Sequence, residues 1–289
     1  MGYRIVTDSG SDLSPRMVKE LDVDLILLHS IMKSSKGDET LDGNTIDLPD
    51  VYALLRQRYS ATTSAVNVDA FTERFEAILK EGDDVLYLGL SSGLSATFHA
   101  SELAAEDLRE KYPERKIIVI DTLAASLGHG MLVYYAVQKK NEGGSIDEVA
   151  DFIRETIPHA CHWFTVDDLF FLKRGGRVSA TTAIVGTALG IKPVLHVDDE
   201  GYLIKKEIAR GRKKSLTALL EKMKKTVVSP ETQTVFISHG DCLADAEYLA
   251  GLIKAEIPVK EIVIDYIGSV IGTHSGPGTV ALFYLGTNR

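Results

Sequence analysis

The stretch of sequence that decides the fold is DVLYLGLSSGLSATFHAS, residues 84–101. It opens with an unbroken apolar run, which is typical of a strand buried on both faces of a parallel sheet. A turn rich in Gly and Ser follows, and Ser95 is a suitable N-cap for a helix that we expect to begin there. The stretch therefore predicts a strand, a turn and a helix in succession, which is the repeating unit of an α/β fold.

Similar units lie on both sides of this stretch. Strand-like apolar runs are YRIVT (3–7), DLILLHSIM (24–32) and KIIVIDT (116–122). Apolar residues recur at helical spacing in residues 69–80, 134–140 and 146–156. Because strands and helices alternate, we expect a parallel sheet with crossover helices over roughly the first 155 residues.

After Pro158 the pattern changes. The segments HWFTVDDLFFL, GIKPVLHVDD and LIKKEIA are strand-like, and the turn at 198–201 predicts a hairpin. A helix over 215–228 and the strands TVFISHGD and KEIVIDYIG follow. We therefore expect two domains: an N-terminal α/β domain with a parallel sheet, residues 1–158, and a C-terminal α/β domain with a mixed or antiparallel sheet, residues 159–289.

The composition excludes several classes of protein. With 32 Lys and Arg against 41 Asp and Glu, the 289 residues carry a net charge of −9, which argues against a general nucleic-acid binder. No apolar run reaches the ~18 residues of a membrane span, and the N-terminus does not have the pattern of a signal peptide. Cys161 and Cys242 are too few for a disulfide framework, so we expect a cytoplasmic protein.

Residues 89–93 match the G-x-S-x-G pattern of a serine hydrolase, with Ser91 as the nucleophile. Asp265 and His274 follow in the required order, although no oxyanion motif precedes the pattern. The same turn allows a second interpretation, because the first turn of a helix after Ser95 presents free N–H groups to an anion. In the simplest interpretation, Ser95 merely caps that helix.

Three further segments carry candidate binding residues, each with a structural alternative. The hydroxyls of 62–64 suit a carboxylate or a phosphate, or they cap their own backbone. Residues 272–278 hold three Gly and a Pro around His274, which indicates an unusual backbone path or an ordinary turn. In 172–179, a Gly pair allows Arg177 to approach a carboxylate closely or to form a surface ion pair.

Residues 205–225 form a basic segment in this acidic protein. They hold nine Lys and Arg against two Glu, a local charge of +7. The segment is either a solvated helix face or a docking surface, for an acidic partner protein in the first place and for nucleic acid as the weaker alternative. The sequence contains no P-loop and no G-x-G-x-x-G motif, and neither Cys has metal-ligand spacing, so we expect no nucleotide, cofactor or metal site.

Taken in order, the segments of this chain resemble those of the DegV family of bacterial fatty-acid-binding proteins. The likeness spans nearly the whole chain, which makes it more specific than any single motif. The segments that carry it are IVTDSGSDLS, GDETLDGNTID, TTSAVN, SSGLSATFHAS, IDTLAASLG, FFLKRGGRVS, LGIKPVLHVDDEGYL, ARGRKKSL and GTHSGPGTVALFYLG.

The resemblance implies a two-domain α/β protein that encloses one long-chain fatty acid, such as palmitate, stearate or oleate. The acyl chain would lie in an apolar tunnel, with the carboxylate at the domain junction. The family pattern places the carboxylate-binding hydroxyls at Thr63 and Ser95, with Ser92 nearby. It places the adjacent polar network at Arg177, His274 and Ser64.

The resemblance also implies a role for the bound lipid. In such a system the protein is a non-catalytic carrier with no cofactor, and a separate ATP-binding kinase subunit related to dihydroxyacetone kinase phosphorylates the presented carboxylate. Arg210 and Arg212 would belong to the docking surface for that subunit. The chain departs from the family pattern at 65–67 and 96–98, so the preferred acyl chain is not predictable.

Overall fold

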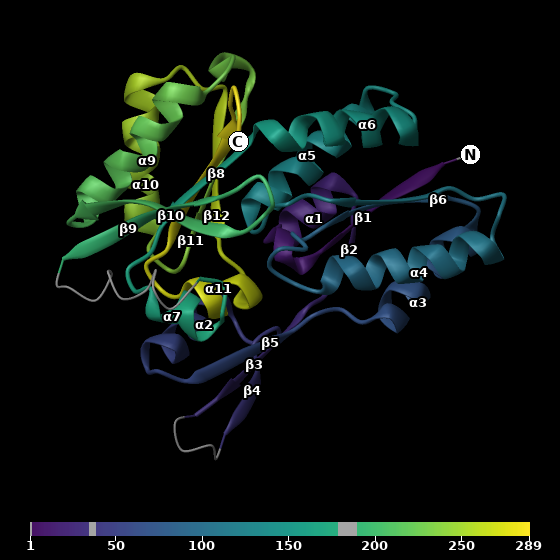
Figure 1. Cartoon of the computed structure of the whole chain (residues 1–289), viewed down its shortest axis with the longest axis horizontal. Helices are drawn as coiled ribbons and strands as arrows, with labels where there is room; N and C mark the ends of the chain where they lie inside the picture. Colours follow the sequence, from purple (N-terminus) through teal and green to yellow (C-terminus); the bar gives the residue numbers. More distant parts are fainter. Residues whose placement is uncertain (1, 35–38, 179–189) are drawn as a thin grey trace.

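A computed structural model describes residues 2–34, 39–178 and 190–289. It is an elongated α/β molecule in which a parallel sheet and a mixed sheet lie side by side, with a small third sheet below them (Figure 1). Ser179, which ends the FFLKRGGRVS segment, lies outside the described residues, as do short parts of two other quoted motifs. No helix in the described ranges is long and apolar enough to cross a membrane.

The first sheet is entirely parallel, as the continuous apolar runs predict. Its strand order is β2-β1-β6-β7. Alternate side chains of its strands point to opposite faces, and each face is covered by helices that bury their apolar stripe. The strands are β1 (Tyr3–Asp8), β2 (Asp24–Ile26), β6 (Asp84–Gly89) and β7 (Ile117–Asp121). One face carries α3 (Val68–Glu81) and α4 (Thr97–Lys111); the other carries α1 (Pro15–Leu21), α5 (Leu127–Asn141) and α6 (Ile146–Thr156).

The second sheet is mixed, with the order β10-β9-β8-β13-β11-β12 and a single parallel pair, β11 with β12, among the described strands. The turn at 198–201 joins β9 and β10, so the predicted hairpin is confirmed. The strands are β8 (Ala160–Thr165), β9 (Ile191–Val197), β10 (Leu203–Arg210), β11 (Thr234–His239), β12 (Glu261–Tyr266) and β13 (Val280–Leu285). Helices α9 (Arg212–Thr226) and α10 (Leu243–Glu256) cover its outer face.

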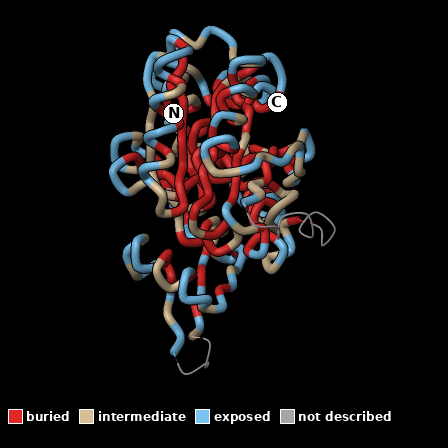
Figure 2. Tube along the Cα trace, turned by 90° about the vertical axis from the view of Figure 1, so that its left-hand side faces the viewer, coloured by how far each residue is buried: buried red, intermediate tan, exposed pale blue. Residues whose placement is uncertain are grey.

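Helix α5 lies between the two sheets and joins them into one body. Its residues Met131 and Leu132 are buried in a core that includes Leu86 of the parallel sheet and Phe283 of the mixed sheet. Figure 2 shows that the buried parts of the chain run through the centre of the main body. The chain passes from one sheet to the other between β7 and β8, and a domain division at residue 158 stays a prediction.

A small antiparallel sheet, β4-β3-β5, projects below the main body (Figure 2). Its chain comes from the N-terminal half, but it packs on the C-terminal half: Tyr52 and Met32 share a core with Phe171 and Ile267. The Tyr52 hydroxyl donates to the Ile267 carbonyl at 2.8 Å. The elements are β3 (His29–Lys33), β4 (Thr40–Asp42), α2 (Leu48–Arg56) and β5 (Ser60–Ser64), with α11 (Ser269–Ser275) as the C-terminal contact.

The local structure differs from expectation at three places. The run 24–32 is not one strand, because the chain leaves the parallel sheet after Ile26, exposes Leu27 and enters the small sheet at His29. The DLFFL end of the first C-terminal strand is instead a short helix, α7 (Phe170–Arg174). Helix α9 begins at Arg212 rather than at residue 215.

The glycine-rich segment around His274 is also more regular than predicted. Gly272 and His274 lie inside α11, and the unusual backbone is confined to the end of that helix. There, Gly276 and Gly278 adopt φ angles of +79° and +78°, which favour glycine. Three short 3-10 turns complete the described elements: Ser9–Ser11, Ile157–His159 and Pro230–Thr232.

Candidate ligand-binding site

A cavity of about 250 Å³ lies where the parallel sheet, the mixed sheet and the small sheet meet. Its walls are mostly aliphatic and aromatic, and its polar groups are contributed by several different elements. The apolar lining includes Leu28, Leu90, Leu94, Phe164, Leu172, Leu203, Ile267, Val270 and Ile271. The polar lining is Thr63, Ser64, Ser95, Ser126, His162, Arg177, His274, Ser275 and Thr279.

Thr63 and His274 form the best-defined polar contact of the cavity. Along β5, Thr62 and Ser64 are exposed while Thr63 points inward, as the alternation of a strand requires. The Thr63 Oγ1 lies 2.8 Å from His274 Nε2, which α11 supplies. A side chain at Gly175 would collide with the His274 ring, so glycine at this position leaves room for the imidazole.

The His274 ring is neutral at ordinary pH. Burial, together with the smaller effect of the charges of Arg177 and Arg174, lowers the pKa of His274 to about 4. Its Nδ1 is buried without a hydrogen-bond partner in the described part of the chain. With the single ring proton on Nε2, the ring donates to Thr63, and the Thr63 hydroxyl proton is then free for an acceptor inside the cavity.

Ser95 lies in the turn before α4, one residue before the N-cap position that was predicted for it. The N-cap position of α4 is Ala96, but the Ser95 Oγ accepts the backbone N–H of Thr97, the first residue of the helix, at 3.3 Å. The Ser95 Oγ also lies 2.9 Å from Thr97 Oγ1, and Thr97 Oγ1 accepts the backbone N–H of Val66 at 3.3 Å. This chain of hydroxyls links the turn before α4 to the loop that follows Thr63, so both predicted carboxylate ligands are held at one end of the cavity.

Arg177 anchors the same turn. Its Nε and one terminal nitrogen donate to the Leu94 carbonyl at 3.1 and 3.0 Å. Two nitrogens of Arg177 thus converge on one backbone carbonyl, and its predicted contact with a carboxylate stays a prediction. None of the ion pairs within the described ranges involves Arg177, and burial lowers its pKa. An uncompensated positive charge is thus placed beside Thr63, Ser95 and His274.

Three further serines were predicted to be functional residues: Ser64 and Ser92 near the carboxylate, and Ser91 as the nucleophile of a hydrolase. Ser64 lines the cavity, but Ser92 does not, and the Ser92 N–H donates to the Asp121 carboxylate at 3.2 Å. Ser91 is fully buried, with its hydroxyl donating to the Gly201 carbonyl at 3.0 Å. In the described part of the chain no histidine lies within hydrogen-bond distance of Ser91, so the geometry of a serine hydrolase is absent.

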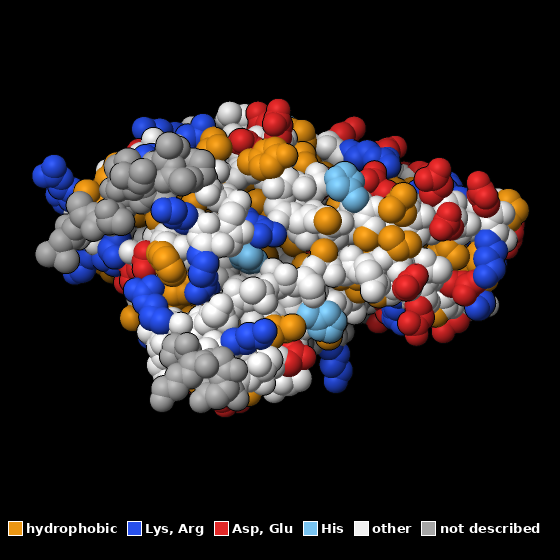
Figure 3. All heavy atoms as spheres, turned by 60° about the horizontal axis from the view of Figure 1, so that its bottom comes forward, with side chains coloured by type: hydrophobic (Ala, Val, Ile, Leu, Met, Phe, Trp, Pro, Cys, Tyr) orange, Lys and Arg blue, Asp and Glu red, His pale blue; other side chains and the backbone are white. Residues whose placement is uncertain are grey.

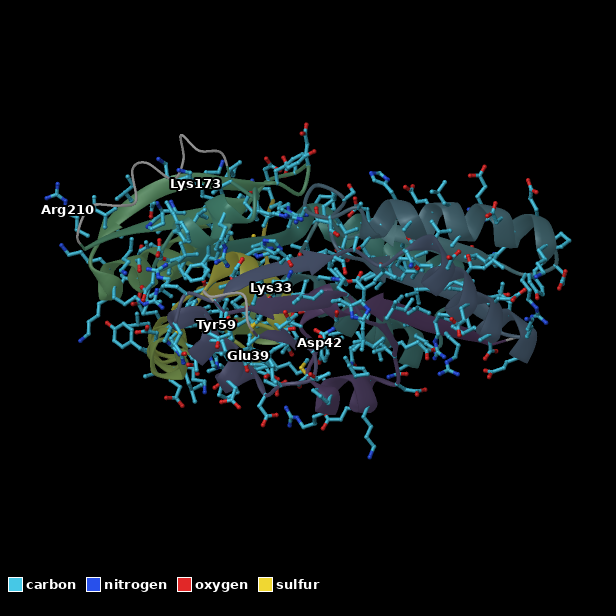
Figure 4. The ribbon with its side chains drawn as sticks, turned by 90° about the horizontal axis from the view of Figure 1, so that it is seen from below. Lys33, Glu39, Asp42, Tyr59, Lys173 and Arg210 are labelled. Atoms are coloured by element: carbon cyan, nitrogen blue, oxygen red, sulfur yellow. The ribbon has the colours of Figure 1, made fainter. Side chains whose placement is uncertain are left out.

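The two predicted docking residues also differ from each other. Arg210 ends β10 and is exposed; Figure 4 shows its side chain pointing away from the ribbon. Arg212 is committed to internal contacts: its Nε lies 2.8 Å from Asp245, and a terminal nitrogen lies 3.7 Å from Asp167. Its side chain is 18% exposed, so Arg212 stabilises the start of α9 and is a poor docking residue.

Sequence reasoning missed part of the cavity wall. Ser126 has a φ of +55° before α5, and its hydroxyl donates to the buried carboxyl of Asp12 and lies 3.0 Å from Ser238 Oγ. Burial raises the pKa of Asp12 to about 8. His162 also lines the cavity, and burial holds its pKa well below the usual value. No local motif marks these residues; long-range pairing of strands and helix ends brings them together.

The fold and the site define a class: an α/β binding protein that encloses an apolar cavity with hydroxyl, imidazole and guanidinium groups at one end. The chain belongs to the DegV family. The sequence model described as "Uncharacterised protein, DegV family" matches residues 3–287, which confirms the resemblance found from the motifs.

Individual relatives agree with this assignment. A DegV domain-containing protein of Clostridium perfringens is 47% identical over 287 residues, which cover 99% of this chain and 98% of the relative. A DegV lipid-binding protein of Thermotoga maritima has a solved structure with a TM-score of 0.84 and 28% identity over the full length of both chains. A DegV family protein of Thermus thermophilus, described as binding fatty acid, has a TM-score of 0.83 and 31% identity, covering 99% of this chain and 100% of its own.

Proposed function

We propose that this protein binds one long-chain fatty acid, with the carboxylate at Thr63 and Ser95 and the acyl chain along the apolar walls of the cavity. The observation that carries the proposal is the lining of the cavity: its walls are mostly apolar, and two hydroxyls, a neutral imidazole and an uncompensated guanidinium lie close to one another among them. The descriptions of the Thermotoga and Thermus relatives support the same class of ligand.

The energetics fit such a ligand. Burying about 14 methylene groups at about 0.8 kcal/mol each contributes about 11 kcal/mol before the cost of association. A carboxylate removed from water needs donors, and hydrogen bonds to a charged group each return about 1.5–3 kcal/mol. The free proton of Thr63 and the hydroxyl of Ser95 supply two such donors, while the charge of Arg177 favours the ionised form of the fatty acid.

We further propose that the protein is a carrier in the cytoplasm, and that a separate ATP-dependent kinase subunit phosphorylates the carboxylate. The support for this role is the family resemblance together with the absence of a serine-hydrolase geometry at Ser91 in the described chain.

The docking prediction now centres on Arg210. Arg210→Glu should lower kinase-dependent acyl phosphate formation by more than tenfold while fatty acid stays bound, because the exposed charge is reversed without disturbing the cavity. Lys225→Glu, at the far end of α9, is the matched exposed control. Equal rates of acyl phosphate formation in the two variants would remove Arg210 from the docking surface.

Native mass spectrometry of the freshly purified protein tests the binding function. We expect a stoichiometric mass excess that extracts into organic solvent as a free long-chain fatty acid. A ligand-free mass that added fatty acid fails to shift would contradict the proposal.

A further inference from the structure

A surface pocket, separate from the cavity, lies near Thr273 and His274. It is lined by Arg58, Ser60, Asp168, Phe170 and Arg174, and we refer to it as the Arg58–Arg174 pocket. None of these residues lines the fatty-acid cavity. Figure 3 shows this face of the molecule: Lys and Arg side chains gather over the mixed and small sheets, and acidic side chains dominate the opposite end.

The positive charge of Arg174 is not compensated by an acid. Its two terminal nitrogens donate to backbone carbonyls, that of Thr273 at 3.3 Å and that of Tyr59 at 3.4 Å. Within the described residues no carboxylate forms an ion pair with it. Burial lowers the pKa of Arg174, and the nearby positive charge of Arg58 contributes to the same direction. Because both guanidinium groups are positively charged and stack on the same two rings, they repel each other. An anion placed between them would relieve that repulsion.

Two aromatic rings hold these guanidinium groups in place. The Arg58 guanidinium carbon lies 5.6 Å from the centre of the Phe170 ring and 5.8 Å from that of Phe171. The corresponding distances for Arg174 are 5.8 and 5.1 Å. Phe170 is 48% exposed, so its ring forms part of the wall of the pocket. The rings fix both arginines without neutralising them, as a site prepared for an anion requires.

Arg58 has a further unusual property. Its φ of +63° places it in the left-handed region, which Gly adopts more readily than a long side chain does. Its partner is Asp168, at 3.3 Å, in an ion pair whose side chains are 62% and 40% exposed. Exposed pairs of this kind are weak, so an incoming anion with two negative charges competes well for Arg58.

The pocket lies close to the proposed binding site of the fatty-acid carboxylate. Ser60 begins the strand that carries Thr63, although the two side chains point to opposite faces of that strand. Arg174 binds the carbonyl of Thr273, the residue before His274. The charge of Arg174 also helps to lower the pKa of His274, so the pocket lies close to the imidazole that contacts Thr63.

We propose that the Arg58–Arg174 pocket is a subsite for a phosphate group that is brought up to the bound fatty acid. The inference rests on the proposed function, because it gives that function a place for the phosphoryl group. Two sources carry the same chemistry: the terminal phosphate of a nucleotide held by the kinase partner, and the phosphate of the acyl phosphate product. The two guanidinium groups supply positive charge and N–H donors for either one.

The test begins with inorganic phosphate as the probe, titrated into the fatty-acid-loaded full-length protein and followed by ³¹P NMR. We expect saturable binding that weakens about tenfold in Arg58→Gly and in Arg174→Gln, with no change in Lys214→Gln, an exposed control on α9. Arg58→Gly suits the left-handed backbone, so it should fold at least as well as the parent protein. Asp168→Asn should strengthen phosphate binding, because it removes the competing carboxylate.

The outcomes separate the two proposals. Phosphate binding that is absent in the parent protein, or unchanged in both arginine variants, would overturn the subsite. Fatty acid retained by Arg58→Gly together with lost phosphate binding supports it. Phosphate binding in a protein that never takes up fatty acid would support the pocket and contradict the proposed function.

Competition identifies the source of the phosphate. Displacement of inorganic phosphate by ATP alone assigns the pocket to the nucleotide, and displacement by a long-chain acyl phosphonate alone assigns it to the product. Displacement by neither compound would overturn the assignment of a phosphate-bearing ligand.

Discussion

Arg177 and Arg212 are both partly buried arginines in basic segments of the sequence, but their surroundings differ. Arg212 lies between the carboxylates of Asp245 and Asp167, whereas Arg177 donates to the Leu94 carbonyl and has no acidic partner among the described residues. The first arrangement neutralises the charge and holds two elements together. The second leaves a positive charge next to an apolar cavity. An uncompensated charge is therefore a better marker of a ligand site than the local density of basic residues.

The strongest test of this comparison replaces each arginine by glutamine. Arg177→Gln should lower fatty-acid affinity about 100-fold, because it removes both the charge and the contacts that position the Ser95 turn. Arg212→Gln should leave affinity unchanged and lower the free energy of unfolding by about 1 kcal/mol. Fluorescent fatty-acid displacement and urea unfolding measure the two quantities. Equal losses of affinity in both variants would show that compensation of the charge does not matter.

A second test asks whether the hydroxyls at the polar end contact the carboxylate. Thr63→Ala or Ser95→Ala should weaken fatty-acid binding by about tenfold, since each removes one hydrogen bond to a charged group. Thr62→Ala and Ser92→Ala are matched controls, because these residues lie in the same segments without lining the cavity. Isothermal titration calorimetry with delipidated protein compares the four variants. Losses shared by controls and test variants would remove the head-group assignment.

A smaller effect is expected on the pH dependence of folding stability, because His274 changes its protonation state on unfolding. Its pKa is about 4 in the folded protein and 6.5 for the free side chain. As pH falls from 6.5 towards 4, the unfolded chain takes up a proton that the folded chain refuses, so stability decreases over that interval. His274→Gln should reduce this slope in thermal melts; burial also lowers the pKa of His196 to about 4, so part of the slope remains. An unchanged slope would contradict the assignment of a neutral ring.

Asp12 should have the opposite dependence on pH. Burial raises its pKa from 3.8 to about 8, so the folded state holds a proton that the unfolded state loses. Stability should therefore decrease as pH rises from about 4 to 8. Asp12→Asn keeps the size of the side chain and should flatten that part of the profile, as measured by melting temperature between those limits. A profile identical to that of the parent protein would indicate that Asp12 is ionised.

Most of the fold was predictable from local patterns, since the strand at 84–89 and the hairpin after residue 190 depend on neighbouring residues. The failures occurred where distant segments decide the outcome. The run 24–32 looks like one strand because most of it is apolar. In the structure its first part pairs with β1 in the parallel sheet, and its last part pairs with β5 in the small sheet. Ser91 matches a catalytic motif, but its hydroxyl donates a hydrogen bond to the carbonyl of Gly201, which is distant in the sequence.

In the candidate site, too, residues in local motifs were predictable, and residues brought together by long-range packing were not. Thr63, Ser95 and His274 were predicted through family motifs, and the structure places them around one cavity. Ser126 was missed because its position depends on the packing of α5 between the two sheets. The pair formed by Arg58 and Arg174 was missed because the two residues are 116 positions apart and meet through the rings of α7.

The contact between the small sheet and α11 also bears on how the protein is made. Thr63 and His274 are separated by 211 positions. At roughly 5–20 residues per second, a ribosome produces His274 roughly 10–40 s after Thr63. During that interval the nascent chain lacks His274, and the apolar side of the small sheet lacks the C-terminal residues that cover it in the folded protein. We therefore expect fatty acid to bind only after α11 has been synthesised, and the exposed apolar side of the small sheet to be a binding site for chaperones before then.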